Sequence, residues 1–237
     1  MTDYFWDGPE DSDEEIESMI QYKNEYEIKN NIKLSKNGLK KHIEEILERN
    51  QTSVDKNWEE KLKIPGMTYY LKKGGSDQNT SQPFFRVEFQ LGKVFKMEKI
   101  VKCMFKPQCV LDWDKNCLTS EFVEVDTNKK SYGLIYVAQK KQFTFQSRDF
   151  YEKGINFYSN GKYYRYTCGI SNDSDFRSIP KDTIRGQTLI NCAIMEYQED
   201  GKLSYRCVTQ CDFKMTVPNF IYTTFLPKAA KSWLAEI

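Results

Sequence analysis

The residues that could do acid–base or metal chemistry are few and poorly placed. The chain of 237 residues has one histidine, His42, which lies in a stretch rich in Lys and Glu. Ser-His-Asp hydrolysis, Cys-His proteolysis and multi-histidine metal sites all need a better-placed imidazole. The sequence also lacks a glycine-rich phosphate loop of either common spacing. We therefore expect no catalytic residues, no metal and no cofactor, and we predict that the protein is not an enzyme.

The seven cysteines show the spacing neither of a metal site nor of a small disulfide framework. Cys207 and Cys211 would share one face of a strand, but residues four apart on a strand are separated by about 13 Å. That distance is too long for both to bind one ion, so we expect small buried apolar side chains. The acidic N-terminal stretch does not resemble a signal peptide. Together these features predict a reduced, cytoplasmic protein.

Charge is distributed unevenly, although the chain has 35 Lys and Arg against 34 Asp and Glu. Residues 1–22 contain eight acidic residues and no Lys or Arg, which leaves 35 basic and 26 acidic residues in the rest. A net charge near zero predicts no nucleic-acid binding. Because the acidic block resists compaction, we expect residues 1–35 to form a disordered tail that is a candidate segment for binding a protein partner.

The elements that must position any site follow from periodicity and turn residues. Apolar residues recur at intervals of three or four positions over 36–49, which predicts an amphipathic helix. These residues are Leu39, Ile43, Ile46 and Leu47. Short extended runs separated by turn-forming residues dominate the remainder. We predict strands at Trp58–Ile64, Met67–Leu71, Phe84–Leu91, Thr119–Val125, Tyr132–Gln139, Asp149–Tyr158, Lys162–Ile170, Thr183–Glu196 and Leu203–Phe213.

Three helical segments interrupt or end this strand order. We expect a helix over Val94–Cys103, a short helix or turn over Leu111–Asp114, and a closing helix over Pro218–Ile237. Pro227 should bend the closing helix because it has no backbone N–H. Antiparallel hairpins with helices on one side predict an α+β domain over 36–237. A curved sheet around one helix encloses space, which is the default ligand pocket.

Five short motifs stand in a characteristic order along the chain. They are Trp58 before the turn Ile64-Pro65-Gly66, Leu111-Asp112-Trp113-Asp114, Ser147-Arg148-Asp149-Phe150, Thr183-Ile184-Arg185-Gly186, and Asp212–Pro218 at the entry to the last helix. In order and separation this set resembles START domains, which are helix-grip lipid-transfer modules, over about residues 40–237. The resemblance implies a curved antiparallel sheet of about nine strands around a long C-terminal helix, one lipid in the tunnel between them, and no catalysis.

The resemblance also implies which residues line the tunnel. Alternation along Leu203–Cys211 puts Tyr205 and Cys207 on one face, which we place inward. Tyr205 resembles a tyrosine that contacts the lipid amide in ceramide-binding members, and the alternative is a core tyrosine whose hydroxyl bonds to the backbone. We expect the lining to contain Asp114, Ile135, Val137, Phe150, Tyr163, Arg165, Thr167, Ile190, Tyr205, Cys207, Phe220, Ile221, Thr224 and Phe225.

Positions that hold the headgroup in START relatives differ in this chain. Asp114 matches a carboxylate of ceramide-binding members, whereas Val137 and Thr167 stand where those members have amide side chains. Some phosphatidylcholine binders have an Arg three residues before the tryptophan, and Val110 replaces it here. The acid–Arg cavity pair of sterol members is missing, since its positions fall on Ile135 and Gly154.

Arg165 is a candidate replacement for these headgroup contacts. If Thr167 faces inward, alternation places Arg165 and Tyr163 on the same face. An inward Arg needs a partner because an unpaired buried charge is costly, and Asp114, Glu152 or a lipid phosphate would serve. The alternative is a bulge that turns Arg165 outward. The inward arrangement favours a phospholipid or a related polar lipid as cargo.

These features predict a monomeric, cytoplasmic lipid carrier that shields one lipid from water and contacts a membrane surface transiently. In the closing helix, three- and four-residue spacing predicts that Phe220, Ile221, Thr224 and Phe225 face the cavity. The alternative function is a non-carrier, an interaction or structural protein that keeps the fold with a filled cavity. The 15 Tyr and 15 Phe of the chain would suit that alternative.

Overall fold

The computed structural model describes residues 36–74, 82–125, 132–141, 145–170, 178–215, 218 and 220–236. The tail predicted over residues 1–35 lies outside this part of the chain. The elements in chain order are α3 (Lys36–Arg49), β1 (Glu59–Ile64), β2 (Met67–Lys72), β3 (Phe84–Leu91), α4 (Met97–Phe105), α5 (Pro107–Trp113), β4 (Cys117–Val125), β5 (Tyr132–Gln139), β6 (Ser147–Ser159), β7 (Lys162–Gly169), β8 (Thr183–Arg185), β9 (Gln187–Tyr197), β10 (Leu203–Asp212), the π-helical turn η3 (Ile221–Phe225) and α6 (Leu226–Glu236).

One sheet contains all ten described strands, in the order β1-β2-β3-β10-β9-β7-β6-β5-β4, with β8 beside β6. Neighbouring strands are antiparallel except for β8, which runs parallel to β6. Turn residues set the hairpins, and Asn160 and Gly161 both have positive φ between β6 and β7, as a two-residue hairpin turn requires. The sheet confirms the predicted α+β class.

The strand predicted over Thr183–Glu196 is divided at Gly186. Before this glycine, β8 crosses to the start of β6, where Arg185 donates to both carboxylate oxygens of Asp149 at 2.8 and 3.1 Å. A Cβ at Gly186 would lie 2.5 Å from a ring carbon of Phe150. Only glycine therefore fits at the crossing without displacing the ring of Phe150. The sequence did not reveal the division of the strand, because the residues on both sides of Gly186 have an extended pattern.

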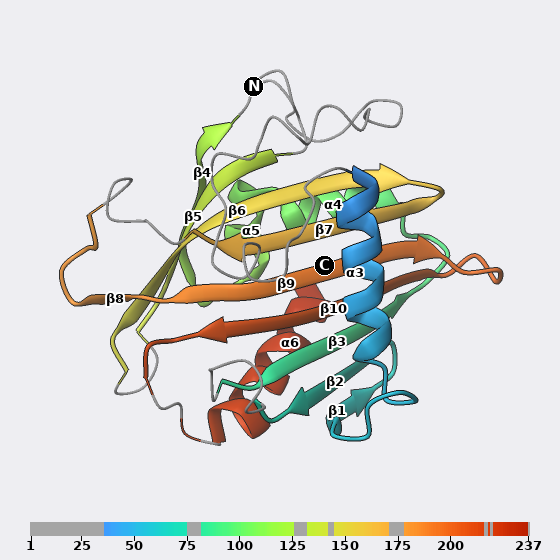
Figure 1. Cartoon of the computed structure of the whole chain (residues 1–237), viewed down its shortest axis with the longest axis horizontal. Coiled ribbons are helices and arrows are strands. Elements are labelled where there is room, and N and C mark those ends of the chain that lie inside the picture. The colour runs from blue at the N-terminus through green and yellow to red at the C-terminus, as the bar shows by residue number, and fades with distance from the viewer. Residues whose placement is uncertain are drawn as a thin grey trace.

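Helices cover both faces of the sheet, and not one side as predicted (Figure 1). On the face turned to the viewer in Figure 1, which we call the outer face, Leu39 and Ile43 of α3 pack in one core with Tyr164, Tyr166 and Ile194. The opposite face, which we call the inner face, is covered by α4, α5 and α6. The structure confirms the predicted helix over 36–49, and it shifts the other two predicted helical segments to the bounds of α4 and α5.

The inner face near α4 is closely packed. Phe89 stacks on Tyr205 with 5.5 Å between ring centroids, and the same core includes Tyr163, Met195 and Met97, the first residue of α4. Because these side chains fill the space between α4 and the sheet, the open space on the inner face lies towards α6.

The last helix begins as the π-helical turn η3 and continues as α6. The Leu226 N–H bonds to the Ile221 carbonyl, five residues earlier. Pro227 follows directly, and its missing N–H and its ring disfavour a regular α-helical turn before it. A wider, π-helical turn therefore lies directly before Pro227, where we predicted a bend. Within the described part of the chain, no helix combines the length and apolar character that a membrane span needs.

Candidate functional site

A cavity of about 300 Å³ lies between the inner face and the last helix. Strands β2, β3, β5, β6, β9 and β10, the residues before β4, and the segment η3–α6 all contribute to it. Its lining is mainly apolar and aromatic, with a set of polar side chains from β5, β6, β9 and β10. The lining residues are Tyr69, Phe85, Val87, Val137, Phe150, Phe213, Phe225, Leu226, Ala229 and Trp233, and the polar Asp114, Asn116, Gln139, Glu152, Thr188, Asn191, Thr209 and Cys211.

Three strands bring a polar cluster together, which we define as Glu152, Arg165, Thr167 and Thr188; the two threonines are buried and the two charged residues are partly buried. The Thr188 hydroxyl on β9 donates to the Glu152 carboxyl on β6. Arg165 on β7 donates from Nε to the Thr167 hydroxyl at 3.1 Å and interacts electrostatically with Glu152. The chain therefore has an acid–Arg pair on its inner face, although the positions of the sterol-type pair are apolar.

Burial sets the protonation of the groups in and beside the polar cluster. It raises the pKa of the Glu152 carboxyl, and the hydrogen bond and the charge of Arg165 offset this rise only in part. Burial also raises the pKa of Tyr205, and that of Cys207 and Cys211 to about 11 and about 12. These thiols are protonated at neutral pH and poorly nucleophilic. The arrangement therefore suits binding rather than covalent chemistry.

The register of β7 decides which way Arg165 faces. Pairing is continuous over Lys162–Thr167 against both neighbouring strands, β6 and β9, without a bulge. Tyr164 and Tyr166 pack on the outer face with α3, whereas Tyr163 packs on the inner face. Alternation therefore places Arg165 on the inner face, and the bulge that would turn it outward does not occur.

The structure brings part of the predicted lining to the cavity. Asp114, Val137, Phe150 and Phe225 line it. A second group lies on the inner face but does not line the cavity, and it consists of Ile135, Tyr163, Arg165, Thr167, Tyr205 and Cys207.

Ile190 lies on the opposite side from its prediction. It packs on the outer face in the core beneath α3. A register shift in the pairing of β9 with β10 precedes it, and Thr188 and Asn191 line the cavity instead. Both faces of this sheet are buried, so an apolar residue on a strand is equally at home on either face. The identity of Ile190 therefore carried no information about its direction.

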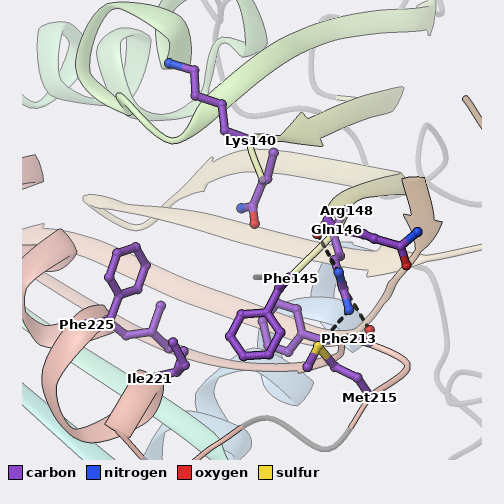
Figure 2. Close-up of a pocket in the computed structure, with 10 residues that line it drawn as sticks. Lys140, Phe145, Gln146, Arg148, Phe213, Met215, Ile221 and Phe225 are labelled. Atoms are coloured by element: carbon purple, nitrogen blue, oxygen red, sulfur yellow. Dashed lines mark hydrogen bonds between the residues drawn. The ribbon is translucent and has the colours of Figure 1, made fainter. Parts of the chain in front are cut away.

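A smaller hollow of about 90 Å³ adjoins the cavity, and Figure 2 shows its lining. Phe213 and Phe225 line both spaces. Arg148 spans one side, where its guanidinium donates to the backbone carbonyls of Gln146 and Phe213. Ile221, which was predicted to line the lipid tunnel, lines this hollow instead.

Phe220 and Thr224 were also predicted to face the cavity, and both are exposed. The spacing used for that prediction assumes 3.6 residues per turn. The π-helical turn that begins at Ile221 has more residues per turn. Consequently Phe225 reaches the cavity, while Phe220 has 49% of its surface exposed.

Sequence reasoning missed the lining from β2, β3, β9 and α6. The same alternation that placed Tyr205 and Cys207 inward puts Thr209 and Cys211 on that face of β10, and both line the cavity. No comparable signal marks Tyr69 or Trp233, which are distant in sequence and meet only in the folded chain. In the part of the chain that the structure describes, no group of three or more His, Cys, Asp or Glu side chains could hold a metal ion.

Solved structures of StAR-related lipid transfer (START) proteins share this fold. Human StAR-related lipid transfer protein 5 superposes with a TM-score of 0.68 at 14% identity, covering 84% of this chain and 92% of that one. Human STARD10 gives 0.64 at 12% identity, covering 79% and 76%. A STAR-related lipid transfer protein from Xanthomonas axonopodis gives 0.57 at 12% identity, covering 76% and 96%. The chain therefore has the START helix-grip fold, as predicted.

Comparisons of the sequence with family models and with curated proteins find no match. The likeness is therefore one of fold.

Proposed function

We propose that this protein binds one lipid in the cavity between the inner face and α6 and transfers it between membranes as a monomeric, cytoplasmic carrier. The observation that carries the proposal is the cavity of about 300 Å³, whose lining combines apolar side chains with the buried carboxyl of Glu152. An amphiphile with a polar head and apolar chains suits such a lining. The names of the structural neighbours describe lipid transfer, which supports the same function.

Within this function we favour a phospholipid or a related polar lipid over a sterol. Arg165 does not itself line the cavity, but it supplies a cation on the inner face that interacts with Glu152, which does. A phosphate requires a cation or several donors, whereas neutral groups can satisfy the single hydroxyl of a sterol. Asp114 lines the cavity and would hold the ammonium of a zwitterionic headgroup.

Lipid exchange also requires transient contact with a membrane surface, because the cargo has to leave and enter a bilayer. We place this contact near η3. Phe220 is half exposed there, and Ile221 and Phe225 line the smaller hollow beside the cavity. An exposed aromatic side chain next to an apolar hollow suits the boundary between headgroups and acyl chains.

Native mass spectrometry of the recombinant protein tests the function, and we expect one phospholipid mass per chain. Ala229→Phe should abolish this mass, because Ala229 lines the cavity and is buried. Lys228→Phe is the matched control, since Lys228 precedes it on the exposed side of α6 and should leave the lipid in place. A wild-type protein without any lipid would favour the structural protein with a filled cavity, and co-purification of sterol alone would overturn the cargo class.

A further inference from the structure

Two aromatic side chains in the cavity wall have buried hydrogen-bond donors without a partner. These are the Tyr69 hydroxyl on β2 and the Trp233 indole N–H on α6, and neither has a hydrogen-bond partner among the described residues. Both side chains line the cavity, and Tyr69 as a whole is 2% exposed. A buried donor that stays unpaired costs free energy comparable to a lost hydrogen bond. A tyrosine rather than a phenylalanine at this position therefore needs an explanation.

In two neighbouring aromatic residues, a donor of the same kind has an acceptor within the protein. Tyr222, which interacts with Tyr69, donates its hydroxyl to the Gln82 side chain at 2.9 Å. Trp113 lies edge-on to Trp233 with 5.9 Å between ring centroids, and its indole N–H donates to a backbone carbonyl in α4 at 2.9 Å. Tyr222 and Trp113 do not line the cavity, whereas Tyr69 and Trp233 do. A ligand in the cavity can therefore supply the acceptors that these two donors lack.

The chemistry around these donors indicates the kind of acceptor. Tyr69 pairs across the sheet with Val87, and Phe85 and Ala229 add further apolar surface to the lining. Burial raises the pKa of the Tyr69 hydroxyl, which keeps it a neutral donor. Neutral donors among apolar side chains match a neutral acceptor that is attached to a hydrocarbon chain. An acyl carbonyl has this character, whereas a phosphate is better matched by the cation of Arg165.

We propose that Tyr69 and Trp233 form a subsite for the acyl carbonyl oxygens of the bound lipid, so that the protein prefers acyl lipids to their ether-linked analogues. The proposal rests on the lipid-binding function proposed above. Tyr69 belongs to the sheet and Trp233 to α6. A lipid whose carbonyls accept from both residues therefore joins the last helix to the sheet while it is bound.

A competition between ester and ether lipids tests the subsite. The protein is incubated with vesicles that contain equal amounts of diester and diether phosphatidylcholine and phosphatidylethanolamine with matched chains. It is then re-isolated, and the bound lipids are quantified by mass spectrometry. We expect the wild type to favour the diester forms about 3- to 10-fold. Tyr69→Phe and Trp233→Phe should each reduce this ratio by lowering diester uptake, while diether uptake stays the same.

Two controls separate recognition from stability. Tyr222→Phe and Trp113→Phe remove donors that already have protein partners, so they should lower the melting temperature and leave the ester-to-ether ratio unchanged. Tyr69→Phe should not lower the melting temperature of lipid-free protein. Equal uptake of diester and diether lipid by the wild type, or an equal effect of Tyr69→Phe on both, would overturn the subsite. Uptake of no lipid at all would instead overturn the proposed function.

Discussion

The outer and inner faces of the sheet are both buried, yet they differ in what they bury. The strand β7 shows the contrast within a few residues. Tyr164 and Tyr166 point into the solid core beneath α3, whereas Arg165 and Thr167 point into the inner face beside Glu152. Apolar burial stabilises the fold, whereas a charge pair that is taken out of water costs desolvation free energy. The comparison teaches that the core beneath α3 and the polar cluster have different tasks, so that changes in that core should leave the choice of lipid intact.

The largest expected effect is on the outer face. Ile43→Ala removes a fully buried side chain of α3 and should lower the free energy of unfolding by about 2–5 kcal/mol, because it loses buried surface and leaves a cavity. Urea unfolding measures this loss. Lys41→Ala is the control on the exposed side of the same helix and should change stability little. If Ile43→Ala altered the choice of lipid as strongly as the stability, the assignment of separate tasks to the two faces would be wrong.

A smaller effect is expected from the charge on the inner face. Arg165→Met keeps the length of the side chain and removes its cation, and a charge-assisted hydrogen bond contributes about 1.5–3 kcal/mol. Phospholipid capture from vesicles should therefore fall roughly 10- to 150-fold while the fold persists.

Arg206→Met is the matched control for this change. Arg206 is on β10, and it pairs with Glu196 at 2.8 Å on the outer side of the sheet. This variant should capture phospholipid as the wild type does. Unchanged capture by Arg165→Met would remove Arg165 from the headgroup site.

The smallest effect concerns the pH dependence of stability. The pKa of Glu152 is raised in the folded protein, chiefly by burial. The unfolded chain therefore loses this proton at lower pH than the folded one. The contribution of Glu152 to the free energy of unfolding should be largest below the ordinary carboxyl pKa. It should fall as the pH rises towards the raised pKa of Glu152 in the folded protein.

Glu152→Gln tests this dependence because an amide cannot ionise. Thermal unfolding between about pH 4 and pH 8 should show a flatter decline for Glu152→Gln than for the wild type. Glu98→Gln, an exposed change on α4, should keep the wild-type slope. The same slope in all three proteins would mean that Glu152 is not desolvated on the inner face.

Local sequence determined much of this fold. The spacing of Leu39, Ile43 and Leu47 predicted α3, and turn-forming residues such as Asn160-Gly161 separated the predicted strands that the structure shows as β6 and β7. Such signals depend on residues that are close in sequence, and they act before any tertiary contact forms. The order of the motifs also indicated the START fold, which the structural neighbours bear out. The sequence alone therefore determined the elements, their order and the class of cavity to expect.

Tertiary structure alone decided which side chains meet in the cavity. Ile190 lies on the outer face, and its apolar side chain could not reveal this because both faces of the sheet accept apolar residues. Gly186 divides a strand because the ring of Phe150 occupies the space that a side chain would need there. Tyr69 and Trp233 come together because α6 packs back over β2, although most of the chain separates them. Periodicity reports which residues share a face of their own element. It does not report which distant element covers that face, and for that reason the donors in the cavity wall emerged only from the folded chain.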